Sequence, residues 1–110
     1  MIIENNKVIF KRINDKTSRK ILSVEGSLMM VEGRYKKDGI GEVHSHDKYE
    51  QVSYIVWDCF EVTVGNEKNV LKKGDGYCVP LNVMHGVKAL EDSIIFDVFT
   101  PIREDLDLKQ

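Results

Sequence analysis

The sequence predicts a small, single-domain, all-β protein folded as a sandwich or barrel. Its 110 residues are 42% apolar and 31% charged, a composition typical of one globular domain. Runs rich in Val, Ile, Tyr and Phe are short, and turn signals recur about every 8–12 residues. No long segment shows the period of an amphipathic helix. These observations argue against a coiled coil, a collagen-like repeat and a chain of alternating strands and helices.

Each predicted strand ends at a residue that stops or turns the chain. Residues 60–64 alternate apolar and polar side chains, and Gly65-Asn66 closes a hairpin after them. Pro80 ends another strand because proline has no N–H to donate to a ladder. Residues 1–20 carry the least signal, and 103–108 fit one short helical turn. The predicted strands are 28–35, 51–57, 60–64, 69–71, 77–79, 86–90 and 93–100.

Charge and hydropathy make several classes of partner unexpected. Sixteen Lys and Arg balance eighteen Asp and Glu, with no long block of one sign, so neither nucleic acid nor a membrane surface is an expected partner. Apolar runs such as 94–96 are far shorter than the roughly 20 residues of a membrane span. The first residues lack the order of a secretory signal, so we expect a cytoplasmic protein. In that reducing compartment Cys59 and Cys78 are expected to be buried thiols.

The three histidines carry the functional prediction. His44 and His46 are two residues apart, so on an extended backbone both imidazoles project to one face. Imidazole nitrogen is a preferred donor for several divalent transition metals. Gln51, or the carboxylate of Glu50 beside it, would provide a further ligand. His85 would complete the set from a segment distant in sequence but adjacent in a closed barrel.

Two motifs resemble those of the cupin superfamily. The first is a glycine, Gly39 or Gly41, followed by His44-Ser45-His46 and then Glu50 or Gln51. The second runs from Gly74 through Pro80 to His85. Asp58 and Asn82 stand where cupin motifs usually have glycine, but Asp and Asn tolerate the left-handed backbone of a turn. The resemblance implies a double-stranded β-helix, or jelly-roll barrel. It also implies a single domain over 1–110, with a core at 28–103, an N-terminal strand region at 1–27 and a tail at 104–110.

Further blocks resemble the pectin-degradation cupins, which convert unsaturated uronates from pectin or alginate breakdown to open-chain keto sugars. The blocks are 28–32, 44–46, 51–54, 60–62 and 97–105. This resemblance implies a uronate substrate and one divalent metal, with Zn, Ni, Mn and Fe all possible. It implies metal ligands at His44, His46, Gln51 and His85, and catalytic residues at Asp97, Phe99 and Arg103.

Asp97 also attracts attention from its surroundings alone. It lies in the apolar run 94–99, where an unpaired carboxylate is costly to bury, so it is a candidate for proton transfer. Phe99, two residues on, should share its face of the strand. Arg103 has the planar fork that grips a carboxylate with two hydrogen bonds.

Three functions remain open from the sequence. The first is a metal-dependent, isomerase-type enzyme that opens the ring of unsaturated uronates and ketonises the product. The second is a noncatalytic module that binds a sugar acid or a metal. The third is an iron-dependent dioxygenase, because one fold hosts many chemistries. A barrel this small with apolar outer strands is expected to form a homodimer.

Overall fold

The computed structural model describes residues 1–106 and consists almost entirely of β-strands. Within these residues no helix is long and apolar enough to cross a membrane. The only helix in this range is the short 3-10 helix η1 (Asn5–Lys7). The strands are β1 (Lys11–Asn14), β2 (Thr17–Glu25), β3 (Leu28–Tyr35), β4 (Ile40–His44), β5 (Glu50–Trp57), β6 (Cys59–Val64), β7 (Glu67–Lys72), β8 (Gly76–Val79), β9 (His85–Ala89) and β10 (Ser93–Thr100).

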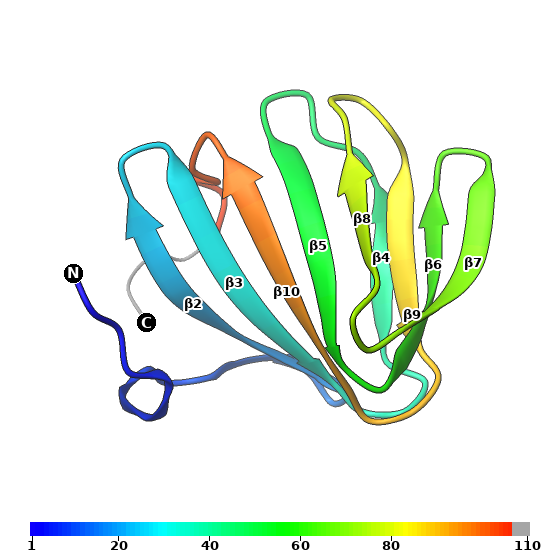
Figure 1. Cartoon of the computed structure of the whole chain (residues 1–110), viewed down its shortest axis with the longest axis horizontal. Coiled ribbons are helices and arrows are strands. Elements are labelled where there is room, and N and C mark those ends of the chain that lie inside the picture. The colour runs from blue at the N-terminus through cyan, green and yellow to red at the C-terminus, as the bar shows by residue number, and fades with distance from the viewer. Residues whose placement is uncertain (107–110) are drawn as a thin grey trace.

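The strands form two antiparallel sheets that face each other (Figure 1). One sheet has the order β1-β2-β3-β10-β5-β8 and the other has the order β4-β9-β6-β7. From β3 onward the pairs are β3 with β10, β4 with β9, β5 with β8, and β6 with β7. This is the pairing of one long hairpin rolled up so that successive strands alternate between the sheets, except for β6 and β7 at its tip, which share the smaller sheet. The predicted all-β jelly-roll, or double-stranded β-helix, is therefore confirmed.

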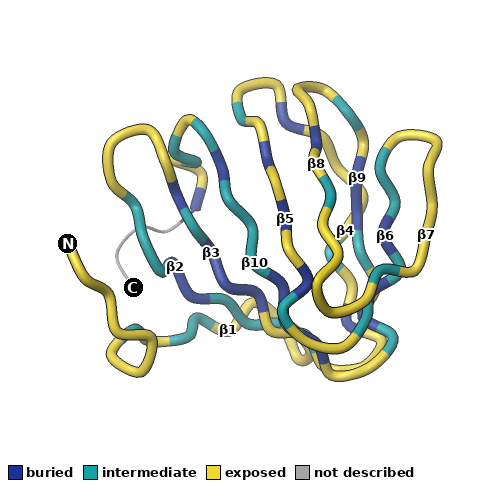
Figure 2. Tube along the Cα trace, viewed as in Figure 1, coloured by how far each residue is buried: buried dark blue, intermediate teal, exposed yellow. Residues whose placement is uncertain are grey.

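Alternation along the strands separates the interior from the surface. On β5, Gln51, Ser53 and Ile55 are buried while Val52 and Tyr54 are exposed, an alternation visible in Figure 2. The buried apolar residues form two clusters. The first contains Ile21, Met29, Val31, Phe99 and Leu106, and the second contains Ile55, Phe60, Val62, Ala89 and Ile95.

A polar band separates these two apolar clusters. Along the inner face of β10, Ile95 belongs to one cluster and Phe99 to the other, and Asp97 stands between them. Ser53 is paired directly opposite Asp97 on β5. The barrel therefore contains an internal polar site with an apolar wall on either side.

The strand predictions held where turn signals were strong. β3 and β10 have the predicted bounds, and β8 ends immediately before Pro80. β1, β2 and β4 were not among the predicted strands. Asp58 and Asn82 do have left-handed backbones, with φ of 56° and 65°.

The two cysteines and the C-terminal segment differ in part from the sequence-based expectations. The expectation of buried thiols is wrong for Cys78, which is exposed because it shares the outward face of β8 with its neighbour Val52 on β5; Cys59 is half-buried. The C-terminal segment turns at residues 103–106, where the Leu106 N–H donates to the Arg103 carbonyl oxygen at 3.4 Å. The remainder of the predicted helical turn, 107–108, lies outside the described residues.

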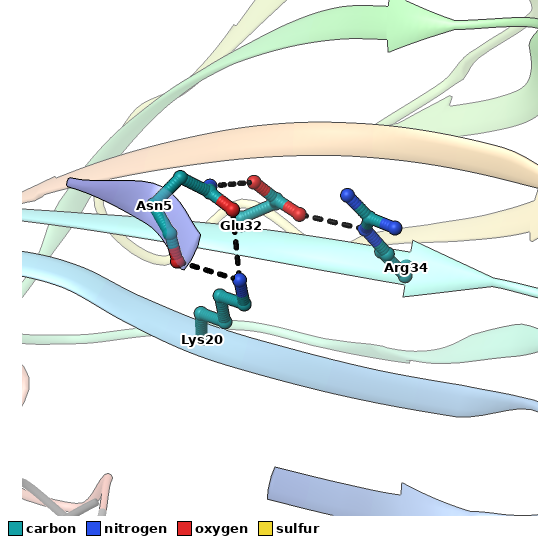
Figure 3. Close-up of polar contacts among 4 residues, drawn as sticks. All are labelled: Asn5, Lys20, Glu32 and Arg34. Carbon is teal, nitrogen blue, oxygen red and sulfur yellow. Dashed lines mark hydrogen bonds and ion pairs between the residues drawn. The ribbon is translucent and has the colours of Figure 1, made fainter. Parts of the chain in front are cut away.

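The N-terminal segment is attached to the sheet by a polar network (Figure 3). The Asn5 amide donates to the Glu32 carboxylate at 2.7 Å, and the Lys20 ammonium donates to both the side-chain and backbone oxygens of Asn5 at 2.8 Å. Arg34 donates to the other Glu32 oxygen at 2.8 Å. Lys20 and Glu32 are buried, so this network supplies the partners that their charges need.

Candidate metal centre

The three histidines converge at one end of the barrel. His44 ends β4, His46 lies in the loop that follows, and His85 begins β9 directly opposite His44. One ring nitrogen from each lies within 4.8 Å of the others. The ring centroids are 4.4 to 5.1 Å apart. The convergence expected from the sequence is present, with His46 and His85 buried and His44 exposed.

Hydrogen bonds orient two of these rings toward the shared centre. Nδ1 of His44 lies 2.6 Å from the carbonyl oxygen of Glu42, and Nδ1 of His85 lies 3.0 Å from that of Val83. A carbonyl oxygen only accepts, so each Nδ1 carries the hydrogen and each Nε2 keeps a free lone pair. This is the arrangement by which proteins fix metal-binding histidines.

The positions of the histidine Nε2 atoms show whether a cation fits between them. Nε2 of His85 is buried and has no hydrogen-bond partner among the described residues. Nε2 of His44 lies 3.1 Å from Nε2 of His46, about the spacing of two donors on one ion with bonds of about 2.0–2.1 Å. A buried, unpaired nitrogen beside two others is costly unless it has a proton or a cation to bind. The residues therefore fit a divalent metal.

The surroundings of His46 and His85 favour neutral imidazoles, the form that binds a metal. Burial, reinforced by Arg103 and the other two histidines, lowers the pKa of His46 to about 4. Burial also lowers the pKa of His85, although its hydrogen bond to the Val83 carbonyl acts in the opposite direction.

Gln51 and Glu50 lie on opposite faces of β5. Gln51 is buried and lines the same cavity as His44 and His85, whereas Glu50 is exposed. The side-chain nitrogen of Gln51 donates to Ser53 Oγ at 2.9 Å and to Asp97 Oδ1 at 3.2 Å. Of these two side chains, only the Gln51 amide therefore lies in the interior of the barrel.

His44 and His85 open onto a cavity of about 310 Å³. This volume is at the lower end of the 300–1,000 Å³ range of small-molecule sites, as expected for a ligand the size of one sugar. Its walls include Gln51, Asp97, Phe99 and Arg103 as well as His44 and His85. Asp97 and Phe99 share the inner face of β10, as the strand period predicts, while Phe96 and Val98 do not line the cavity.

Asp97 lies on a central strand, between β3 and β5, and not on an edge. Burial raises its pKa, although hydrogen bonds from Ser53 and Gln51 and the charge of Arg103 act to lower it. A carboxyl group with a raised pKa holds a proton closer to neutral pH, which suits a group that donates or removes protons.

Arg103 lies over the aromatic wall of the site. Its guanidinium carbon is 4.8 Å from the centre of the Phe99 ring and 5.8 Å from that of Tyr49. It forms two hydrogen bonds with Asp105, at 3.1 Å from Nε and 2.6 Å from Nη2. The Arg103 guanidinium, which was expected to hold a substrate carboxylate, therefore holds the Asp105 carboxylate in this structure.

Several residues at the site were not found from the sequence. Ser53 is hydrogen-bonded to Asp97 at 2.5 Å, and Tyr35 and Tyr77 line the cavity beside them. Burial, followed by the charge of Asp97, raises the pKa of both tyrosines, so they remain hydroxyl groups. The period of β5 places Ser53 on the face of Gln51 and would have identified it. The pairing of Arg103 with Asp105 had no signal beyond their nearness in sequence.

Comparisons with known proteins agree with this fold. No family model matches the chain. It is 40% identical to the pectin degradation protein KdgF of Dickeya dadantii (strain 3937) over 97 residues, which cover 87% of this chain and 88% of that protein.

Two solved structures are similar over nearly the whole chain. KdgF from Halomonas sp. superposes with a TM-score of 0.92 at 33% identity, covering 96% of this chain and 98% of that one. An RmlC-like cupin from Shewanella frigidimarina NCIMB 400 gives a TM-score of 0.89 at 34% identity, covering 93% of this chain and 91% of that one. The chain therefore belongs to the cupin superfamily and, within it, to the family of the pectin degradation protein KdgF.

Proposed function

We propose that this protein is a metal-dependent enzyme that opens the ring of 4,5-unsaturated uronates and ketonises the product. The uronates would come from pectin or alginate degradation, in keeping with the name of its KdgF relatives. The observation that supports this most directly is the composition of one cavity. His44 and His85, the half-buried carboxyl group of Asp97 and the Arg103 guanidinium line a space of about 310 Å³, and His46 converges with the other two imidazoles at its edge.

His44, His46, His85 and Gln51 would hold the divalent ion, which could be Zn, Ni, Mn or Fe. When bound, the ion would act as a Lewis acid and stabilise negative charge on a substrate oxygen. All four donors are neutral, so the protein itself leaves the double positive charge uncompensated. Such a site favours an anionic ligand, and a uronate is one.

Arg103 and Phe99 would position the sugar. The guanidinium fork matches the two oxygens of the uronate carboxylate, which would take the place that Asp105 now has. Phe99 forms an apolar wall beneath Arg103 and would pack against the sugar ring. Together they would orient the substrate with its C4 and C5 atoms toward Asp97.

Asp97 would transfer the proton that completes the reaction. Ring opening transfers the proton of the C1 hydroxyl to the ring oxygen, forms the C1 carbonyl and breaks the bond from C1 to that oxygen, which becomes the enol hydroxyl on C5. Ketonisation then needs a proton at C4 and the loss of one from the enol oxygen. The product is an isomer of the substrate, so no oxidant or water is consumed. Asp97 would give the proton to C4 directly or through water; its position in the cavity wall and its raised pKa support this role.

The test is loss of the ultraviolet absorbance of the conjugated C4=C5 bond. Metal-loaded protein should remove this absorbance from unsaturated galacturonate much faster than buffer alone. Asp97→Asn should lower turnover by about 100-fold or more while galacturonate binding is retained. Asp47→Asn, an exposed aspartate in the loop after His46, is the matched control and should keep full activity.

The other two functions predict different results in the same assay. A noncatalytic sugar-acid or metal-binding module would bind galacturonate and leave the absorbance unchanged. An iron-dependent dioxygenase would consume oxygen in proportion to turnover and stop under argon. Full activity under argon, with no oxygen consumed, is the outcome that the proposal requires.

A further inference from the structure

Three polar side chains form a hydrogen-bonded triangle on the inner face of the larger sheet. Gln51 Nε2 donates to Ser53 Oγ at 2.9 Å, and Ser53 Oγ lies 2.5 Å from Asp97 Oδ1. Gln51 Nε2 also reaches Asp97 Oδ1 at 3.2 Å. Gln51 and Ser53 are both buried, and Ser53 is paired directly opposite Asp97 across β5 and β10.

The donors in this triangle follow from the chemistry of its members. Both contacts to Asp97 are made at Oδ1, which accepts hydrogen bonds whether the carboxyl group is ionised or carries its proton on Oδ2, and a serine hydroxyl has one hydrogen to give. Ser53 Oγ lies 2.5 Å from Asp97 and donates its hydrogen to that carboxyl group. Toward Gln51 the Ser53 hydroxyl can therefore only accept. Tyr77 also interacts with the Ser53 side chain, and its hydroxyl carries a hydrogen of its own. Gln51 must therefore turn its NH2 group toward Ser53 and Asp97.

We propose that Ser53 is a positioning residue that holds the amide of Gln51 with its carbonyl oxygen toward the three histidines. This inference rests on the proposed function, which makes Gln51 the fourth metal ligand. Nitrogen and oxygen of the amide share one carbon, so fixing the nitrogen on Ser53 and Asp97 also fixes the oxygen. The carbonyl oxygen is the amide atom that coordinates metals, whereas the NH2 group has only hydrogens to present.

The same triangle accounts for an amide, and not a carboxylate, at position 51. A glutamate there would have two acceptor oxygens and no hydrogen for Asp97, which lies 3.2 Å from the present nitrogen. Two carboxylates at such a distance repel each other, and one of them must take up a proton. With Gln51, Asp97 keeps both of its donors and the site keeps a neutral ligand. Ser53 thus links the proposed metal ligand to the proposed proton donor.

The experiment compares Co²⁺ binding by purified wild-type protein and position 53 variants. Ser53→Ala removes the acceptor for the amide and should weaken Co²⁺ affinity by about 10-fold or more, as is usual for residues that orient metal ligands. It should also change the visible spectrum of bound Co²⁺, because the oxygen donor is no longer fixed. Ser53→Thr keeps the hydroxyl and should restore the wild-type spectrum. Should Ser53→Ala fail to fold, Ser53→Val, which has the shape of threonine without its hydroxyl and brings no metal-binding atom, carries the same expectation, with Ser53→Thr as its matched comparison.

Ser93→Ala is the matched control. Ser93 is also buried, and its hydroxyl donates to the carbonyl oxygens of Cys59 and Glu91 at 3.1 and 2.8 Å, away from the histidines. Its loss should lower stability without changing Co²⁺ affinity or spectrum.

The inference is overturned if Ser53→Ala binds Co²⁺ with wild-type affinity and spectrum. It is also overturned if Ser53→Thr and Ser93→Ala lose as much affinity as Ser53→Ala, because the effect would then be one of general stability. Gln51→Ala separates this inference from the proposed function. Weak binding by Gln51→Ala with normal binding by Ser53→Ala contradicts only the role of Ser53, whereas normal binding by Gln51→Ala contradicts the ligand set itself.

Discussion

Two residues keep a glycine-like backbone without being glycine. Asp58 turns the chain between β5 and β6, and Asn82 turns it between β8 and β9, with φ of 56° and 65°. Left-handed backbone is costly for most side chains but less so for Asp and Asn, whose short polar groups bond locally. Departures from the glycines of the cupin motifs therefore leave both turns intact.

This makes a prediction for Asp58, whose side chain is exposed. Asp58→Ala should lower the free energy of unfolding by about 1 kcal/mol, because alanine is strained at positive φ. Asp58→Gly should change it by no more than about 0.5 kcal/mol, because relief of strain offsets the extra entropy of the unfolded chain. Urea denaturation measures both. Asp47→Ala, at an exposed position without left-handed backbone, is the control, and an equal loss there would contradict the explanation.

At the scale of elements, the N-terminal segment depends on Asn5. Its amide and backbone satisfy the buried charges of Lys20 and Glu32 at the same time (Figure 3). Asn5→Ala removes the side-chain partner of both, so it should lower the free energy of unfolding by about 1–3 kcal/mol. Asn6→Ala, in the same short helix and exposed, should stay within about 0.5 kcal/mol. Equal midpoints in urea for the two variants would show that the network does not contribute to stability.

The turn at 103–106 borders the cavity through Arg103 and Leu106 and pairs Arg103 with the carboxylate of Asp105. Leu106 packs into the cluster that contains Phe99, and Arg103 is paired with Asp105, which is half-exposed. An exposed ion pair contributes only about 0.2–1 kcal/mol, so a substrate carboxylate should displace Asp105 readily. The pair is therefore a weak competitor for the proposed substrate.

Asp105→Asn should consequently lower KM for the unsaturated uronate by about two- to fivefold, the equivalent of that ion-pair energy, and leave kcat nearly unchanged. Steady-state kinetics from the absorbance assay measure both constants. Glu104→Gln, at the exposed neighbouring position, removes the same charge without touching the fork and should leave KM as it is. A rise in KM for Asp105→Asn would mean that Asp105 holds Arg103 in place instead of competing with substrate.

For the whole molecule, the sequence was informative where burial and turn chemistry agree. β3 and β10 were predicted to the residue because both are rich in apolar residues and end at clear turns. β4 is almost entirely exposed, so it has no apolar period and is held by its pairing with β9. β2 lies inside the N-terminal strand region expected at 1–27, but its bounds were not predicted, because the burial of Lys20 in the Asn5 network breaks the expected alternation.

At the site, too, local sequence patterns predicted some features and not others. Spacing and motif were enough to bring His44, His46 and His85 to one point, because each lies at a strand end or in the loop beside one. The Ser53 contact with Asp97 depends on the register between β5 and β10, which no local pattern encodes. Local chemistry thus predicted the metal donors, while the hydrogen bonds that orient them required the complete fold.

The outer face of the larger sheet gives the prediction for assembly. Val52 and Tyr54 on β5 are 53% and 51% exposed, and their cross-strand neighbours on β10 are Val98 and Phe96. These four apolar residues are adjacent across the two strands, and none of them lines the cavity. A contiguous apolar patch of this kind marks an interaction surface, and two copies related by a two-fold axis would cover it on both.

We therefore expect a homodimer through this face, with twice the 12.6 kDa mass of one chain in sedimentation or light-scattering measurements. Val52→Glu puts a charge at the centre of the face and should give monomers with unchanged circular dichroism, because a charge buried in an apolar interface is costly. Val70→Glu is a close match, since Val70 is a strand valine, 51% exposed, on β7 of the other sheet, and this variant should remain dimeric. A monomeric wild type would contradict the dimer itself. Dissociation by Val70→Glu but not by Val52→Glu would mean that the dimer forms through the other sheet.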